Sequence, residues 1–304
     1  MDPKRLEHFL RIARAGSVSR AAEELEVAQP TLSRELREME QELGVPLLTR
    51  HARGVSLTPA GEALRTRAEV ILSLLGGLRD DIRSAGDEPT GRVALGMPSS
   101  LCGCLATRIV SEFRTRYPQV RLELREAPSN QLRLAVLNRE LDVAVLTAPV
   151  SDRQLVLRPL LTEPFVLVAP AGQKHARRQI RLEEALSLPL IVPIKPNATR
   201  TLIDTAIERS GQVPDILLET DSTQVSEFLA AGLGYALLPA SSAASTAMRH
   251  LDSVPIRDMA ITRLLALPGG AAITLASQRM VSLLCELTRG LIESGELQGS
   301  YTGP

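Results

Sequence analysis

One segment near the N-terminus, residues 17–58, constrains the fold more than any other part of the chain. Ser17 or Ser19 can cap a short helix, because a serine oxygen accepts a hydrogen bond from an unpaired N–H of the first turn. Residues 26–28 then predict a turn. Pro30 fits the first position of the next helix, where the N–H that proline lacks has no partner in any case. This order predicts two short helices joined by a tight turn.

A single apolar stripe predicts the second of these helices. Apolar residues recur along it at steps of four, three and four: Leu32, Leu36, Met39 and Leu43. Gly44 follows the stripe and can end the helix in the left-handed conformation. Residues 49–58, with Arg53 and Gly54 at the tip, predict a two-stranded wing. The layout is that of a winged helix-turn-helix, which places its second helix in the major groove of DNA.

Residues 4–61 resemble, position for position, the N-terminus of LysR-type transcriptional regulators. The most distinctive matches are Ala21-Ala22, Gln29-Pro30, Ser33-Arg34, Leu43-Gly44, Pro46-Leu47, Arg50 and residues 57–61. One departure is Leu48, where the family usually has phenylalanine. Because that position packs in the core, we expect the change to alter the core and not the reading of DNA.

The resemblance implies which side chains face the DNA. Glutamine suits the paired donor and acceptor of adenine, and arginine suits the two acceptors of guanine. Arginines of the wing would contact phosphates or enter the minor groove, which sets register more than sequence. The expected DNA-binding residues are Gln29, Pro30, Thr31, Ser33, Arg34, Arg37, Arg50 and Arg53. Each of them alone could belong to a solvated helix face, and their joint placement favours the interface.

Net charge argues weakly against DNA binding. DNA-binding domains are often basic, yet the first 65 residues hold ten Lys/Arg and ten Asp/Glu. We therefore expect six glutamates to face away from the DNA: Glu23, Glu24, Glu26, Glu38, Glu40 and Glu42. A near-neutral domain binds nonspecific DNA poorly as a monomer, so several copies would have to act together.

A long helix from residue 59 to about residue 84 supplies a means of assembly. Its heptad-spaced apolar residues suit two helices that lie side by side. The expected dimer seam is Leu64, Ala68, Ile71, Leu75, Leu78 and Ile82. Alternatively, the helix docks on its own domain through the same stripe; the family resemblance favours the dimer. Residues 84–91, small, polar and broken by Pro and Gly, predict a hinge.

After residue 91, short apolar runs alternate with helical stretches. Strands are expected at residues 92–97, 120–126, 143–146, 165–169, 190–193, 216–219 and 235–238, and helices at 105–117, 131–138, 201–210, 222–231 and 274–293. The alternation predicts an α/β fold with a parallel sheet between helices, in two lobes. Tyr117-Pro118, residues 140–145 and residues 231–239 resemble the LysR effector-binding domain, which is built like a periplasmic binding protein.

These patterns predict three regions. Residues 1–58 form an all-α winged helix-turn-helix DNA-binding domain, and residues 59–90 form the linker helix and hinge. Residues 91–304 form a two-lobed effector-binding domain, with one lobe at about 91–162 and 267–304 and the other at about 163–266.

Hydroxyl residues follow several of the predicted strands, where ligands of open α/β sheets bind. Residues 195–200 add two cations and an amide ahead of a helix. Helix N-termini, hydroxyls and a cation together favour an anion, most simply a carboxylate. The expected effector-binding residues are Ser99, Ser100, Ser129, Ala148, Asn197, Thr199, Arg200, Ser222 and Thr223. Alternatively, the serines and threonines only cap their helices.

Cys102 and Cys104 begin the helix after the first of these strands, where a helix N-terminus can lower a thiol pKa. Some LysR-type regulators sense oxidants through cysteines, so redox sensing is one alternative function. The other interpretation is two small residues that pack beside the pocket.

The composition excludes several classes. Three cysteines fit no disulfide framework, four scattered histidines offer no metal-ligand spacing, and no nucleophile–base pair or phosphate loop is present. We expect neither an enzyme nor a cofactor. Without a signal peptide or an apolar run of membrane length, the chain is expected in the cytoplasm and not in a membrane.

The expected function is therefore regulation of transcription. The resemblance implies a dimer of dimers on promoter DNA, contact with RNA polymerase, and activation or repression modulated by a small effector. Gly91-Arg92-Val93 and residues 196–200 also resemble the nitrogen assimilation control branch. That branch can act without a small co-effector, so control by protein level is a second alternative.

Overall fold

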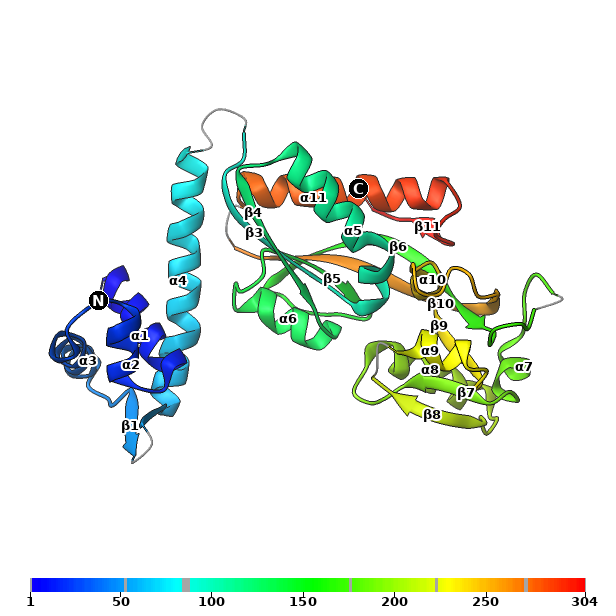
Figure 1. The fold of residues 1–304 in the computed structure, drawn as a ribbon, viewed down its shortest axis with the longest axis horizontal. Coiled ribbons are helices and arrows are strands. Elements are labelled where there is room, and N and C mark those ends of the chain that lie inside the picture. The colour runs from blue at the N-terminus through cyan, green and yellow to red at the C-terminus, as the bar shows by residue number, and fades with distance from the viewer. Residues whose placement is uncertain are drawn as a thin grey trace. The chain divides into compact units, whose positions relative to one another are not determined.

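The computed structural model describes residues 2–51, 54–83, 88–174, 177–221, 224–270 and 273–303. The chain separates into an N-terminal unit that runs to Arg83 and a larger unit that holds nearly all of the remainder (Figure 1). Each unit has hydrophobic cores of its own.

The N-terminal unit is a helical domain with a small wing. Its elements are α1 (Pro3–Ala15), α2 (Val18–Glu24), α3 (Gln29–Leu43), β1 (Leu48–His51), β2 (Gly54–Leu57) and α4 (Pro59–Arg83). Ser17 caps α2 by accepting a hydrogen bond from the Arg20 N–H, and Gly44 ends α3 with a φ of 71°, which confirms both predictions. Pro30 is the second residue of α3 and not the first, but it still lies in the turn whose N–H groups lack partners.

Three of the four stripe residues of α3 are buried: Leu32, Leu36 and Met39. Leu43, at the end of the helix, is exposed, so this prediction was wrong at the last position. Leu48, the departure from the family, is half-buried and packs against both clusters of this domain.

The first half of α4 belongs to the core of the same domain. Ala68 is completely buried in a cluster with Leu6, Phe9 and Met39, and Leu64 packs against that cluster. Leu64 and Ala68 are therefore not available for the expected seam. Farther along α4 the apolar side chains are uncovered: Ile71, Leu74, Leu78 and Ile82 are exposed. The docking interpretation holds for the first half of α4, and the dimer seam stays a prediction for the second half, where Leu75 is half-buried.

In its described residues the second unit is built on one mixed sheet of nine strands, ordered β4-β3-β5-β10-β6-β9-β7-β8, with β11 beside β6. The first lobe contains β3 (Gly91–Met97), β4 (Val120–Glu126), β5 (Val143–Thr147), α5 (Ser99–Arg116), α6 (Ser129–Leu137), α11 (Leu275–Glu293) and β11 (Ser300–Tyr301). The second contains α7 (Leu182–Leu186), β7 (Leu190–Pro193), α8 (Ala198–Ser210), β8 (Ile216–Thr220), α9 (Val225–Ala230) and β9 (Tyr235–Pro239), and α10 (Ala240–Ala243) follows it.

Two long antiparallel strands, β6 (Leu155–Val168) and β10 (Ser253–Pro268), run through both lobes. The prediction of a parallel sheet is therefore wrong at its centre. Parallel pairs occur on either side, β4-β3-β5 in one lobe and β9-β7-β8 in the other. The strands β10 and β11, the first half of β6, and the short helices α7 and α10 were not predicted from the sequence.

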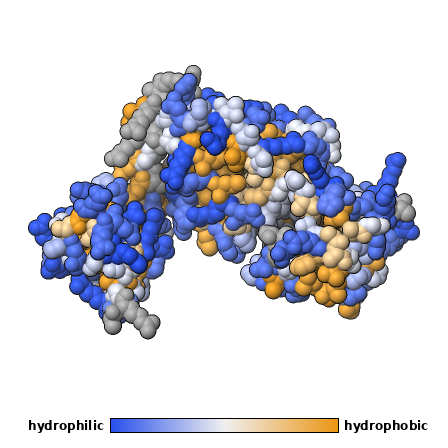
Figure 2. Space-filling model, in the orientation of Figure 1, coloured by the Kyte–Doolittle hydropathy of each residue, from blue (hydrophilic) through white to orange (hydrophobic). Residues whose placement is uncertain are grey.

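Each lobe carries helices on its part of the sheet. In the first lobe α5 and α11 cover one face and α6 covers the other (Figure 1). Figure 2 shows hydrophobic surface on the second lobe. The exposed apolar side chains of this lobe include Val213, Leu217 and Leu233. Among the described helices, none combines the length and hydrophobicity that crossing a membrane requires.

Candidate nucleic-acid interface and ligand cleft

Helix α3 presents one polar face to solvent. Residues at helical spacing along this face line a shallow depression: Pro30, Thr31, Arg34, Arg37, Glu38 and Gln41. Because positions three and four residues apart lie on the same side of a helix, the cations of this face can contact one surface together. The depression contains four of the residues expected to contact DNA.

Most of the expected DNA-binding residues are accessible. Gln29, Pro30, Arg34, Arg37 and Arg50 are exposed, Thr31 and Ser33 are half-buried, and Arg53 lies outside the described residues. The side chain of Arg34 is 70% exposed, and its Nε lies 3.7 Å from Oε1 of Glu38. Glu38 also accepts a hydrogen bond of 2.6 Å from Arg5. Glu38 lines the same depression as Arg34, so the expectation that it faces away from this surface is wrong. Its carboxylate pairs with Arg34 and with Arg5.

Two sets of side-chain contacts that the sequence did not predict hold α3 in place. Nδ1 of the buried His8 lies 2.6 Å from Oε2 of Glu35, which joins α1 to α3. Glu40 Oε1 accepts hydrogen bonds from the N–H groups of Leu47 at 2.8 Å and Leu48 at 3.3 Å. Through Glu40, α3 is connected to the start of the wing.

The larger unit contains a cleft formed by two adjoining cavities of about 480 and 270 Å³. Residues from both lobes line it, and both cavities share Ser99, Ser100, Glu126, Pro193, Asn197, Asp221, Leu238 and Ser242. Five of the expected effector-binding residues line it: Ser99, Ser100, Ser129, Asn197 and Thr199. Ala148 and Arg200 are not part of its lining, and Ser222 and Thr223 lie outside the described residues.

Several of these polar side chains already have structural partners. Ser129 Oγ accepts a hydrogen bond of 3.0 Å from the Thr147 N–H. Asn197 caps α8 by accepting hydrogen bonds from the N–H groups of Thr199 at 2.8 Å and Arg200 at 3.3 Å. Capping therefore accounts for Asn197, whereas Ser129 bonds to β5 and not to its own helix; both still line the cleft.

The two cations expected to attract an anion are engaged elsewhere. Arg200 is buried and donates to Asp204 at 2.7 Å, Glu219 at 2.7 Å and the Pro193 carbonyl at 3.0 Å. Lys195 Nζ lies 2.8 Å from the same Asp204. Burial alone would raise the pKa of Asp204, but hydrogen bonds from Lys195 and Arg200 hold it below its usual value. Arg200 is thus a structural residue, contrary to the expectation.

A buried ionic network that the sequence analysis missed lies under the cleft. Arg263 of β10 donates from Nε to Glu163 of β6 at 2.7 Å, and from its two other nitrogens to Thr147 at 2.6 Å and Ser100 at 2.9 Å. Glu163 also accepts hydrogen bonds from Ser241 at 2.5 and 3.0 Å. Arg263 lines the smaller cavity. The network therefore links the cleft to both strands that run through the two lobes.

Cys102 and Cys104 do not have the lowered thiol pKa values that the redox alternative requires. Burial first, and then the negative charge of Glu126, raises the pKa of Cys102 to about 12. Burial also raises the pKa of Cys104 to about 12, with a further contribution from Glu163. A raised pKa leaves little reactive thiolate near neutral pH, which argues against the redox alternative and favours two residues that pack beside the pocket. Within the described ranges, no group of three or more His, Cys, Asp or Glu side chains is placed to hold a metal ion.

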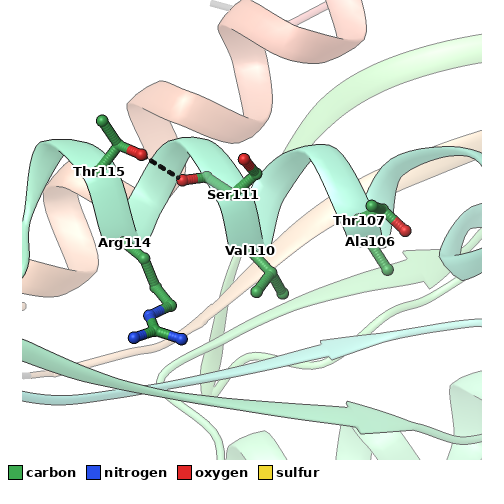
Figure 3. Close-up of a pocket in the computed structure, with 6 residues that line it drawn as sticks. All are labelled: Ala106, Thr107, Val110, Ser111, Arg114 and Thr115. Atoms are coloured by element: carbon green, nitrogen blue, oxygen red, sulfur yellow. Dashed lines mark hydrogen bonds between the residues drawn. The ribbon is translucent and has the colours of Figure 1, made fainter.

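A separate shallow depression lies on the outer face of α5 (Figure 3). It is lined by Ala106, Thr107, Val110, Ser111, Arg114 and Thr115. Most of these side chains are small, and Thr115 Oγ1 donates to the Ser111 carbonyl at 2.9 Å. The depression is open and shallow, unlike the cleft, and suits a flat surface better than a small molecule.

Comparison with known proteins identifies relatives over both units. The family profile described as "Bacterial regulatory helix-turn-helix protein, lysR family" matches residues 3–62, and "LysR substrate binding domain" matches residues 86–284. The Bacillus subtilis regulator YcgK is 31% identical over 79% of this chain and 80% of its own. The nitrogen assimilation regulatory protein Nac of Klebsiella aerogenes is 28% identical over 98% of this chain and 99% of its own.

The fold is also found among solved structures. Full-length CbnR, solved in a complex with its target DNA, superimposes with a TM-score of 0.68 at 20% sequence identity. The match covers 95% of this chain and 100% of the CbnR chain.

Proposed function

The chain belongs to the LysR family of transcriptional regulators, and from this we propose that it binds promoter DNA through the exposed face of α3. The family consists of regulators and not enzymes, which confirms the expectation of a non-enzymatic protein. The single observation that carries the proposed interface is the alignment of Arg34 and Arg37 with Pro30, Thr31 and Gln41 on one solvent-facing side of α3. Such a helix face is what a winged helix-turn-helix inserts into the major groove.

The roles of the individual residues follow from their chemistry. Arg34, whose side chain is mostly exposed, suits the two acceptors of guanine, and Gln29 suits adenine. Arg50 on the wing contacts phosphate and sets the register of the complex. Gln29, Pro30, Thr31 and Ser33, at the start of the helix, contact base edges and the nearest phosphates.

Self-association uses the exposed half of α4. Ile71, Leu74, Leu78 and Ile82 leave an apolar stripe uncovered on the described helix, and a second copy of α4 is its natural partner. The small-residue face of α5 is a candidate for the second contact that joins two dimers into a tetramer. Two or four DNA-binding domains together compensate for the near-neutral charge of each one.

The cleft between the lobes is the proposed effector site. Ligands of such folds bind at the edge of the sheet where strands end and helices begin, and the volume of the larger cavity, about 480 Å³, suits a small metabolite. A ligand that contacts both lobes shifts the protein toward a closed arrangement, because it binds that arrangement more tightly. The regulator acts in the cytoplasm and contacts RNA polymerase on its promoters.

The experiment that tests the proposal is a gel-shift assay with the DNA upstream of the protein's own gene. Binding should weaken as salt rises, because each neutralised phosphate releases counterions. A scrambled fragment of equal length and base composition serves as the control. Equal affinity for both fragments at every salt concentration would contradict sequence-specific binding.

A further inference from the structure

The ionisable side chains of the cleft have an unexpected balance of charge. Among the described residues that line the two cavities, the acids are Glu126 and Asp221, and the only cation is Arg263. Arg263 is neutralised by its ion pair with the buried Glu163. Glu126 and Asp221 each line both cavities, one from each lobe. The surface that a ligand meets is therefore acidic.

Neither carboxylate is neutralised by a cation within the described part of the chain. Asp221 has no ion pair or hydrogen bond there. Glu126 lies close enough to Cys102 for its charge to raise the pKa of that thiol, and a thiol donor does not cancel a negative charge. The nearest cations to this end of α8, Lys195 and Arg200, are held by Asp204 and Glu219. The two carboxylates are available to a positively charged ligand.

An unpartnered hydroxyl on an otherwise buried residue points independently to a bound molecule. Ser245 is only 8% exposed and lines the larger cavity. Its side chain has no hydrogen-bond partner among the described residues. Its hydroxyl oxygen is accessible from the cavity and can hydrogen-bond to a polar group of a ligand. The site is also closely built, because a Cβ on Gly103 would lie 2.7 Å from the Ser245 Cβ.

The rest of the larger cavity is apolar. Its wall is formed by Ile191, Val192, Val225, Leu238 and Met248. An apolar wall with a few placed polar groups is the usual composition of a small-molecule site. The ligand therefore needs an apolar body as well as a positive charge.

We propose that the cleft binds a small molecule that carries an ammonium group beside an apolar body. The ammonium group lies against Glu126 and Asp221, the body packs on the apolar wall, and a polar atom reaches Ser245. This ligand class rests on the proposed function of the cleft as the effector site. A plain carboxylate, the ligand favoured by the sequence, is repelled by the same pair of acids. An amine and an amino acid share the ammonium chemistry, and the experiment separates them.

The test is isothermal titration calorimetry on the full-length protein with matched probes. The phenyl set is 2-phenylethylamine, phenylalanine, 3-phenylpropionate and 2-phenylethanol; the alkyl set is hexylamine, hexanoate and hexanol. We expect the amine of at least one set, or phenylalanine, to bind, and both carboxylates and both alcohols to give no heat of binding. Binding of phenylalanine but not of the amines identifies a zwitterion within the class.

Variants locate the binding to this site. Glu126→Gln and Asp221→Asn should each raise the Kd of the binding amine at least tenfold, about 1.4 kcal/mol at 25 °C. Glu123→Gln is the matched control, because Glu123 lies on the same strand and outside both cavities, in an ion pair with Arg92. This control should leave the Kd unchanged.

Two results would overturn the ligand class. One is binding of a carboxylate without binding of the amines or phenylalanine, which leaves the cleft as the effector site but with the opposite ligand. The other is no binding of any ammonium probe. The gel-shift assay on the same preparations reports separately on the regulator: specific DNA binding that persists leaves that proposal standing, and its loss contradicts it.

Discussion

Arg263 and Glu163 form an ion pair of 2.7 Å between the two strands that run through both lobes, and their side chains are 1% and 0% exposed. Both charges are thus buried together beneath the cleft. A buried pair contributes little net stability, but removing one partner leaves an uncompensated charge. The pair also holds Thr147 and Ser100 from the first lobe and Ser241 from the end of the second.

Removal of one partner should therefore be costly and removal of both much less so. We expect Arg263→Met to lower the free energy of unfolding by about 3–5 kcal/mol. The Arg263→Met, Glu163→Met double variant should recover at least half of that loss. Urea unfolding followed by circular dichroism measures all three proteins. A double variant as unstable as the single one would show that charge burial is not the cause.

Arg34 should be the side chain of α3 on which specific binding depends most. Arg34→Ala is expected to weaken binding at the preferred site by about 1–3 kcal/mol and to relax selectivity there. Fluorescence anisotropy with site and scrambled duplexes measures both effects. Arg121→Ala is the control, because Arg121 is a highly exposed arginine on β4 of the larger unit. An unchanged affinity for Arg34→Ala would mean that another face of the domain enters the groove.

The exposed half of α4 should hold the dimer together. Leu78→Glu places a charge in the predicted seam, and we expect a halved mass by light scattering together with weaker DNA binding. Leu217→Glu is a matched control, since Leu78 is 56% exposed and Leu217 is 54% exposed. Equal masses for the parent and Leu78→Glu would show that α4 does not form the dimer interface.

Cys102 and Cys104 should react slowly with thiol reagents. With pKa values raised to about 12, the thiolate fraction at pH 7 is at least about a hundredfold below that of an exposed cysteine. Because burial disfavours the thiolate, labelling of Cys102 and Cys104 by iodoacetamide should remain slow up to pH 9. Mass spectrometry of the labelled peptides measures this rate. Rapid labelling at pH 7 would restore the redox hypothesis.

Gly61, in the first turn of α4, should tolerate no side chain. An added Cβ would lie 2.1 Å from the Leu47 carbonyl oxygen, so backbone would have to move. We expect Gly61→Ala to destabilise the DNA-binding domain by about 1–3 kcal/mol. Gly76→Ala, in the same helix with no atom within 4 Å of the added Cβ, should stabilise it by up to about 1 kcal/mol. Thermal unfolding of both variants checks the contrast.

The helical domain could be predicted almost residue by residue because its signals are local. The cap at Ser17, the left-handed Gly44 and the spacing of Leu32, Leu36 and Met39 each act over a few residues. The positions of Glu38 and Glu40 could not be predicted in this way. Their orientation depends on contacts with α1 and the wing, which are distant in sequence.

In the larger unit the strands could not all be predicted, because some of them pair with segments that are distant in the sequence. β10 reads in sequence as an irregular stretch with Arg257, Asp258 and Arg263, and its role depends on β6, about a hundred residues earlier. Arg263 therefore went unnoticed, although a cation inside an apolar run signals a buried ion pair. Arg200 was misassigned for the opposite reason. Its position near the start of a helix suggested that it binds the effector, but its partners are Asp204 and Glu219.

Because Ala68 of α4 is packed with Phe9 and with Met39 of α3 in a single core, α3 and α4 move together as one body. If two copies of α4 pair, the point at which they cross sets the distance between the two α3 helices. Sliding that point by one helical turn, about 5.4 Å, changes the distance by a length on the order of one to two base pairs. The spacing of the half-sites in an operator would then depend on how the two α4 helices are aligned with each other, although that contact does not involve the DNA.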